Sequence, residues 1–224
     1  MRLASFHVKE FRSVWDSGEI AVDDVTCLVG KNEAGKTTLL KALYRISPLV
    51  DDDAKFDATD DYPRKESGNY LHDVDSKERS PADVIIAKFT LEPEDISVVE
   101  AVFGQSALTS YEITLTKGYA NKLSYGMSFS ETAARAHLVS EADLTDPVRS
   151  SLAGATSWSD LKTRLEAVEE TSEIARLLTL VKAIVPNIGS YYAFNNLLFS
   201  RVPDFLYFDE YYQMRGCENI EALQ

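Results

Sequence analysis

The sequence is short of cysteine and histidine and has no long hydrophobic run. It contains two cysteines, Cys27 and Cys217, and three histidines without the spacing of metal ligands. Disulfide-stapled and zinc-binding folds are therefore not expected. No apolar stretch approaches the roughly 20 residues that span a bilayer, and no basic segment followed by an apolar one begins the chain. We expect a soluble, cytoplasmic protein without a membrane segment.

Positive charge is also scarce. The 224 residues include 36 acidic and 23 basic ones, which gives a formal net charge of −13. Lys and Arg form no stripe that would attract a nucleic-acid backbone, so we expect nucleic acid to bind only through a more complete protein or a partner. Acidity is densest in the run Asp51–Asp61, which predicts a solvated loop rather than a metal cage.

Two of the ten glycines stand in one informative motif. Residues 30–37 have the sequence Gly-Lys-Asn-Glu-Ala-Gly-Lys-Thr, which matches the pattern G-x-x-x-x-G-K-[ST] of a phosphate-binding loop. The β-branched run Val25–Val29 before it predicts a buried strand. After it, four apolar residues share one face of a predicted helix: Leu39, Leu40, Leu43 and Ile46. The alternative is an ordinary glycine-rich turn, which the agreement of motif and context disfavours.

The motif assigns chemical roles to its residues. The free amides at the helix start and the Lys36 ammonium would meet the β- and γ-phosphates of a nucleotide. Lys36 would neutralise charge on the γ-phosphate, Thr37 would ligate Mg²⁺, and Thr38 would reach a phosphate oxygen. ATP and Mg²⁺ are the expected ligands. The candidate binding residues of the loop and helix start are Asn32, Glu33, Ala34, Gly35, Lys36, Thr37 and Thr38.

The N-terminal residues add a resemblance to a known family. A predicted strand at Arg2–Lys9 is followed by Glu10-Phe11-Arg12-Ser13, a second predicted strand at 20–22 and then the phosphate loop. The element "K-x-F-R-S" ahead of "G-K-N-E-A-G-K-T-T-L-L-K-A-L" resembles the ABC-type ATPase heads of the RecF/SMC superfamily, and within it the OLD-like and AAA-type ATP-binding proteins. The resemblance implies that Arg12 and Ser13 lie beside the nucleotide. The alternative for Arg12 is a surface arginine.

The rest of the chain predicts strands first and helices later. Strands are expected at 84–91, 111–116 and 122–129, the last two as a hairpin, and a helix from 93 to 103. Apolar residues recur every three or four positions between 131 and 184, which indicates helices. We therefore expect an α/β P-loop NTPase fold, with the mixed, partly antiparallel sheet of an ABC-type first lobe and a helical extension. The predicted units are an ATP-binding lobe at 1–130, a helical insertion at 131–185, and a returning strand with the start of a second lobe at 186–224.

A second acidic motif follows the helices. Four apolar residues, Phe205–Phe208, precede Asp209 and Glu210 and match a Walker B strand, whose aspartate orders the Mg²⁺ shell and whose glutamate polarises the attacking water. No signature motif of an ABC head precedes this segment. It resembles instead a stretch that OLD-like proteins carry before their arm. We favour a structural strand, with the catalytic pair as the alternative.

Three functions stay open at this point. The favoured one is ATP binding, with hydrolysis completed by a second lobe and a partner protomer that supplies the ABC signature. The resemblance implies service in DNA processing or repair or in anti-phage defence, and the chain would be the N-terminal part of a larger, homo-oligomeric head. The second function is a nucleotide-controlled assembly module without its own turnover. The third is a self-sufficient P-loop ATPase that uses Asp209 and Glu210.

Overall fold

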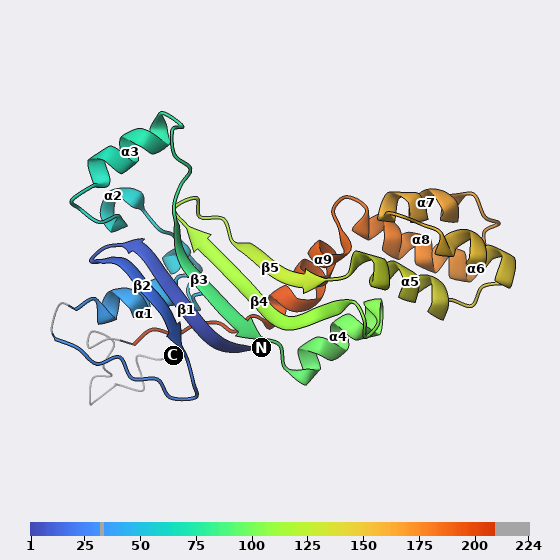
Figure 1. Ribbon diagram of the computed structural model, residues 1–224, viewed down its shortest axis with the longest axis horizontal. Helices are drawn as coiled ribbons and strands as arrows, with labels where there is room; N and C mark the ends of the chain where they lie inside the picture. Colours follow the sequence, from blue (N-terminus) through green and yellow to red (C-terminus); the bar gives the residue numbers. More distant parts are fainter. Residues whose placement is uncertain (32–33, 209–224) are drawn as a thin grey trace, which may run out of the picture.

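An antiparallel sheet forms the middle of the molecule (Figure 1). The computed structural model describes residues 1–31 and 34–208. Its five strands are arranged in the order β2-β1-β3-β4-β5, and every neighbouring pair is antiparallel, which corrects the mixed sheet that we expected. Short connections join β1 to β2 and β4 to β5, and such hairpins impose antiparallel pairing. The strands are β1 (Arg2–Phe11), β2 (Val14–Ala21), β3 (Asp83–Thr90), β4 (Leu108–Gly118) and β5 (Ser124–Phe129).

The central strands carry the core. β3 buries Ile85, Ala87 and Phe89, which alternate along the strand, and β4 buries Ile113 and Leu115 on the face that meets them. α1 (Lys36–Tyr44) packs on β1 and β3, and α4 (Pro93–Phe103) packs on β4. The strands predicted at 84–91, 111–116 and 122–129 and the helix predicted at 93–103 are confirmed.

The helix predicted after the phosphate loop is present as α1. Ala42 is fully buried, and Leu39 and Leu43 pack on the core. We expected Leu40 on the buried face as well, but it is 43% exposed and does not belong to that face. The contacts with β1 and β3 fix the direction of α1 relative to the sheet.

The strand predicted at 25–29 is absent from the described structure. Residues 22–31 have no helical or strand conformation, and Val25 and Val29 are 88% and 89% exposed. Cys27, between them, is exposed as well. β1 already pairs with β2 on one side and β3 on the other, and residues 25–29 pair with neither edge strand of the described sheet. A β-branched sequence does not form a strand without a partner ladder.

The acidic run is not the solvated loop that we expected. It folds into a 3₁₀ turn (Asp51–Ala54) and α2 (Ala58–Asp61), and α3 (Ser67–Asp75) follows; α2 and α3 lie beyond one end of the sheet (Figure 1). Asp61 is only 2% exposed. Tyr62 stacks on Tyr70 with ring centroids 3.9 Å apart, and Tyr119 packs against both. These aromatic contacts attach the segment to the sheet.

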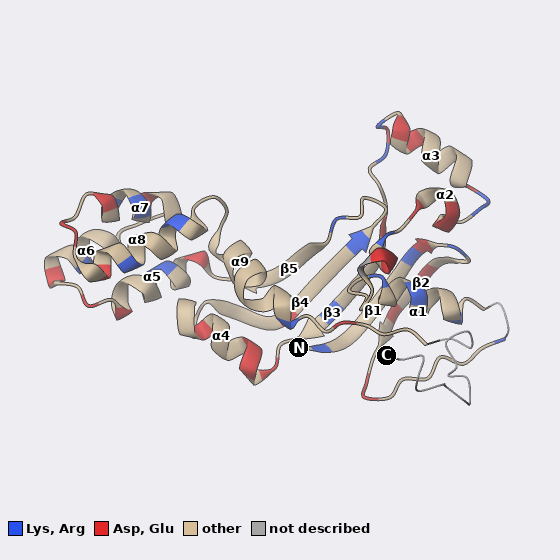
Figure 2. Ribbon diagram, turned by 180° about the vertical axis from the view of Figure 1, so that it is seen from behind, with Lys and Arg blue, Asp and Glu red and all other residues tan. Residues whose placement is uncertain are grey.

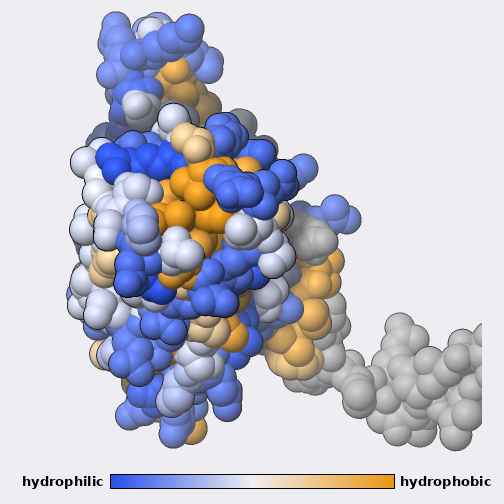
Figure 3. All heavy atoms as spheres, turned by 90° about the vertical axis from the view of Figure 1, so that its right-hand side faces the viewer, coloured by the Kyte–Doolittle hydropathy of each residue, from blue (hydrophilic) through white to orange (hydrophobic). Residues whose placement is uncertain are grey.

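The predicted helices between 131 and 184 are confirmed as α5 (Glu131–Glu141), α6 (Asp146–Ala153), α7 (Trp158–Glu166) and α8 (Ser172–Ile184). They form an extension beyond the other end of the sheet (Figure 1), and in an end-on view its hydrophobic side chains show between hydrophilic ones (Figure 3). The Glu131 carboxylate accepts hydrogen bonds from the amides of Gly189 and Ser190, which joins α5 to the segment that follows α8. The division into units at 130 and 185 stays a prediction.

The segment after α8 returns to the sheet as helical turns. It consists of α9 (Gly189–Tyr192), a π-helical turn (Ala193–Leu198) and a 3₁₀ turn (Phe199–Arg201). Among described residues no single helix is long and apolar enough to cross a membrane. α8 and the segment Gly189–Arg201 satisfy length and composition only as a pair, which is bent by 89°.

The predicted returning strand is reduced to one bridge in the described residues. Phe205 forms an isolated parallel bridge with Pro48, directly after α1. The Phe205 amide donates to the Ser47 carbonyl at 2.7 Å, and the Leu49 amide donates to the Phe205 carbonyl at 3.0 Å. Asp209 and Glu210 lie outside the described residues.

Candidate functional site

The described part of the phosphate loop closes around the Lys36 ammonium. Lys36 Nζ donates hydrogen bonds to the carbonyl oxygens of Gly30 (2.8 Å) and Lys31 (2.7 Å). The Ala34 amide donates to the Lys31 carbonyl at 3.2 Å. The loop therefore holds one positive charge beside the start of α1. Asn32 and Glu33, two of the predicted phosphate contacts, lie outside the described residues.

Gly35 turns the loop into α1. Its φ is 87°, in the left-handed region that favours glycine. A Cβ at this position would lie 3.0 Å from Val14 Cγ2 and 3.4 Å from Ser13 Oγ. Both the conformation and the close approach of the β1–β2 hairpin require glycine here. The loop consequently lies directly against that hairpin.

α1 begins with amides that have no acceptor in the helix. The Leu39 amide donates to the Gly35 carbonyl at 2.9 Å, and the amides of Lys36, Thr37 and Thr38 precede it. Among the described residues no side chain caps the helix start, and its first turn contains no acidic residue. The helix dipole adds partial positive charge at the same place. An anion would therefore meet amides, dipole and ammonium together.

Ser13 and Arg12 come from the turn between β1 and β2. Ser13 Oγ lies 3.4 Å from Thr38 Oγ1, which brings the hairpin to the half-buried second threonine of the helix start. Arg12 has a φ of 53°, and its amide donates to the Asp61 carbonyl oxygen at 2.6 Å. Arg12 is thus an exposed arginine whose backbone is held by a hydrogen bond to the α2 segment. Its contact with a nucleotide stays a prediction.

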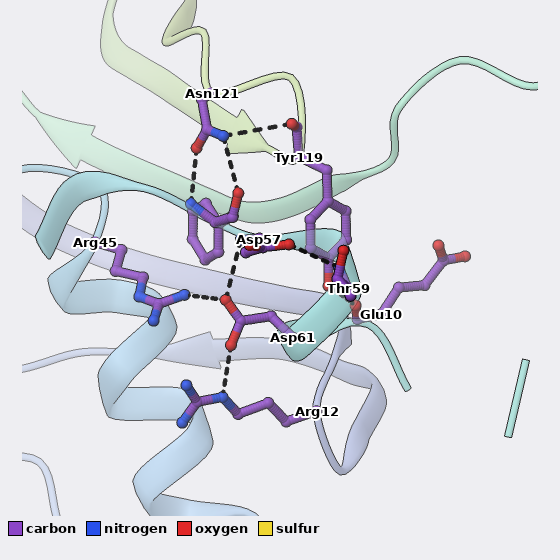
Figure 4. A network of polar contacts seen from close by, with 9 residues as sticks. Glu10, Arg12, Arg45, Asp57, Thr59, Asp61, Tyr119 and Asn121 are labelled. Atoms are coloured by element: carbon purple, nitrogen blue, oxygen red, sulfur yellow. Dashed lines mark hydrogen bonds and ion pairs between the residues drawn. The ribbon is translucent and has the colours of Figure 1, made fainter. Parts of the chain in front are cut away.

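Asp61 is the centre of a network of polar contacts (Figure 4). One carboxylate oxygen accepts from Arg12 Nε at 2.8 Å, and the other accepts from Arg45 Nη1. Burial acts to raise the pKa of the Asp61 carboxyl, but hydrogen bonds from Arg45 and Arg12 outweigh it and hold the pKa below its usual range. The sequence analysis missed Asp61, because 49 positions separate it from Arg12 and no short-range spacing connects them.

A cavity opens between the β1–β2 hairpin and the segment of α2 and α3. It has a volume of about 500 Å³ and is lined by Arg12, Ser13, Asp60, Tyr62 and Arg64. The rings of Trp15 and Tyr62 pack in a T-shaped contact with 6.1 Å between centroids. The cavity therefore combines two cationic side chains, a carboxylate and an aromatic wall, and its lining residue Ser13 contacts Thr38 at the helix start.

Charge elsewhere is mixed. Lys and Arg are scattered among Asp and Glu over the described sheet and helices and form no continuous basic band (Figure 2). Within the described residues no group of His, Cys, Asp and Glu could hold a metal ion.

A comparison with known families agrees with this site. The model of the AAA ATPase domain family matches residues 1–138. The chain belongs to this family. The match covers the whole antiparallel sheet, the phosphate loop of this AAA ATPase domain and α4, and it ends within α5. No curated protein matches the chain significantly.

The family supports ATP as the ligand of this AAA ATPase domain, with Mg²⁺ as its usual companion. The structure brings Ser13, Gly35, Lys36 and Thr38 together around the helix start, with Arg12 in the same hairpin. The Thr37 side chain is exposed at the first turn of α1. The individual roles of these residues stay predictions.

Proposed function

We propose that this chain binds ATP with Mg²⁺ at the phosphate loop and is part of an OLD-like ABC-type ATPase. One observation carries the proposal: the Lys36 ammonium, the uncapped start of α1 and the left-handed Gly35 converge beside a cavity in a chain of the AAA ATPase family. Backbone amides and a lysine at a helix start are the arrangement that binds nucleotide phosphates.

The residues of the site fit the parts of the nucleotide. Lys36 would exchange its carbonyl acceptors for oxygens of the β- and γ-phosphates, and the amides of 34–38 would surround them. The Thr37 hydroxyl would hold Mg²⁺, and Thr38 and Ser13 would face the next phosphate. The cavity lined by Arg12 and Tyr62 would receive the nucleoside.

Hydrolysis needs groups beyond those that the described residues bring to the loop. A carboxylate to order the Mg²⁺ shell and a base to orient water are required. We propose that a second lobe and a partner protomer supply them, so that the active unit is a homo-oligomer. Service in DNA processing or anti-phage defence follows from the family resemblance, with nucleic acid bound by the complete assembly.

One observation favours the self-sufficient ATPase as a second candidate. Asp204 accepts from Ser47 Oγ at 3.2 Å, whereas the Tyr207 ring lies 6.1 Å from Tyr44 and 5.5 Å from Lys41 Nζ. The segment therefore runs from the end of α1 toward its start, where the phosphate loop lies. This direction would suit a Walker B role for Asp209 and Glu210.

Binding of ATP·Mg²⁺ to Lys36→Ala, measured by calorimetry, tests the primary proposal. We expect at least about a 100-fold loss of affinity, because the charge-assisted hydrogen bonds to phosphate disappear. Lys31→Ala is the matched control: it removes the same charge from the same loop but keeps the carbonyl that Lys36 contacts, and it should cost less than about threefold. Equal affinities of Lys36→Ala and wild type would reject the site.

The double variant Asp209→Asn, Glu210→Gln separates the two sources of turnover. If a second lobe or a protomer supplies the catalytic carboxylates, ATPase activity of the oligomeric protein survives. If Asp209 and Glu210 are Walker B, turnover falls by orders of magnitude, because the base and the metal-ordering carboxylate are lost. ATP binding without turnover at any protein concentration would indicate the assembly module instead.

A further inference from the structure

A single buried carboxylate serves two arginines beside the candidate nucleotide site. The Asp61 side chain is 3% exposed, and it pairs with Arg12, which is 38% exposed, and Arg45, which is 19% exposed. Asp61 also accepts from the Asp57 amide at 3.2 Å, so its oxygens are held from several directions. A buried carboxylate with this set of donors has one orientation available to it.

The two arginines need this counter-ion because they converge on the same aromatic ring. The guanidinium carbons of Arg12 and Arg45 lie 5.1 and 5.4 Å from the centroid of Phe11, which is fully buried. Without the carboxylate, two like charges would stand close together at a partly desolvated position. Arg45 is the residue that ends α1, so the carboxylate connects the β1–β2 turn to the phosphate-loop helix.

The contact with Asp61 also determines which nitrogens of the Arg12 guanidinium are available to bind a ligand. Asp61 accepts from Nε, and the two terminal nitrogens of Arg12 point away from Asp61 and toward α1 in Figure 4. The Arg12 amide is held by the Asp61 carbonyl oxygen at 2.6 Å, and the backbone of Arg12 has a positive φ of 53°. Backbone and side chain are therefore set by the same residue.

We propose that Asp61 is a positioning residue for nucleotide binding, which holds Arg12 with its terminal nitrogens directed at the phosphate side of the site. This inference rests on the proposed function. It also gives the α2–α3 segment a role, since this segment supplies both Asp61 and the Arg64 wall of the cavity. A positioned arginine loses less conformational entropy when it binds a phosphate.

A double-mutant cycle tests whether Asp61 acts through Arg12. The affinity for ATP·Mg²⁺ is measured by calorimetry for wild type, Arg12→Ala, Asp61→Asn and the double variant, each shown to be folded by thermal unfolding. We expect each single change to weaken binding about tenfold, and the double variant to bind within about twofold of Arg12→Ala alone. Asp57→Asn, which can still cap α2 and does not contact Arg12, should bind as wild type does.

Other outcomes overturn the proposal. If the affinity loss of the double variant equals the product of the two single losses, Asp61 does not act through Arg12 and merely supports the fold. If Arg12→Ala or Asp61→Asn binds with wild-type affinity, Asp61 has no positioning role in nucleotide binding. If Asp61→Asn does not fold, Asp61→Glu replaces it in the cycle: it keeps the charge but displaces it by one methylene, and the same pattern is expected. Unchanged binding in Lys36→Ala rejects the proposed function itself. Lost binding in Lys36→Ala together with multiplying losses in the cycle rejects only the role of Asp61.

Discussion

Asp61 in the lobe around the sheet and Arg135 in the helical extension are buried charges with opposite surroundings. In the lobe, the buried Asp61 carboxylate has two arginine partners. In the extension, Arg135 on α5 is only 9% exposed, and within the described part of the chain its Nε has no hydrogen-bond partner. Arg135 instead donates to Thr132 Oγ1 at 3.3 Å and lies 5.7 Å from the Trp158 ring centroid.

The carboxylate one turn before Arg135 is occupied by neutral donors. Glu131 accepts from the Trp158 indole and from the amides of Gly189 and Ser190. Its role is to join helices. Beside the candidate ligand site the lobe pairs a buried carboxylate with two arginines, whereas the extension holds an incompletely hydrogen-bonded cation within an apolar core.

Of the substitutions that test this difference, Asp61→Asn should have the largest effect. We expect the free energy of unfolding at neutral pH to fall by about 4 kcal/mol, because two arginines lose a buried partner. The folded pKa of Asp61 lies below its ordinary value of 3.8, so its stabilisation is present above that value and is lost as the pH falls through the lower folded pKa. Denaturant unfolding at several pH values should therefore show the two proteins converging in acid. A difference that stays constant down to low pH would contradict the charge-based account.

Leu161→Ala on α7 tests the other half of the comparison. Leu161 is 1% exposed in the core of the extension, so its truncation should lower the free energy of unfolding by about 3 kcal/mol. ATP affinity should stay within about twofold, because the residue lies far in sequence and fold from the phosphate loop. Lys162→Ala on the same helix removes only a weak 3.8 Å ion pair and should change stability by less than about 0.5 kcal/mol. Loss of ATP binding in Leu161→Ala would show that the two regions depend on each other.

Arg135→Met has a smaller expected effect than Asp61→Asn or Leu161→Ala. Replacement of an incompletely hydrogen-bonded buried arginine by an apolar side chain of similar length should leave the free energy of unfolding within about 1 kcal/mol of wild type or raise it. Chemical denaturation measures this change. A loss of about 3 kcal/mol would mean that Arg135 has an essential polar role in the extension after all.

Local sequence patterns predicted much of the fold. Alternation located β3 and the hairpin of β4 and β5, and the glycine motif located the start of α1, because each depends on residues close in sequence. The run Val25–Val29 has the composition of a strand, yet strand formation depends on a neighbour that composition does not specify.

The residues of the candidate site also fall into those that local sequence predicts and those that it does not. Lys36 and Gly35 follow from a motif of eight residues, and Ser13 from a resemblance that extends over one hairpin. Asp61 stood in a run of aspartates without any feature that distinguished it from its exposed neighbours. Only the folded chain brings it to Arg12 and Arg45.

The bridge between Pro48 and Phe205 has a consequence for the time course of synthesis. The neighbouring contact of Ser47 with Asp204 joins positions 157 residues apart, the span that separates the bridged pair as well. At ribosomal rates of 5–20 residues per second, the end of the phosphate-loop helix waits roughly 8–30 s for its partner to be made. Closure of so long a loop is also entropically costly. A nascent chain therefore has its sheet, whose last strand ends at Phe129, available for folding well before the end of α1 acquires this contact.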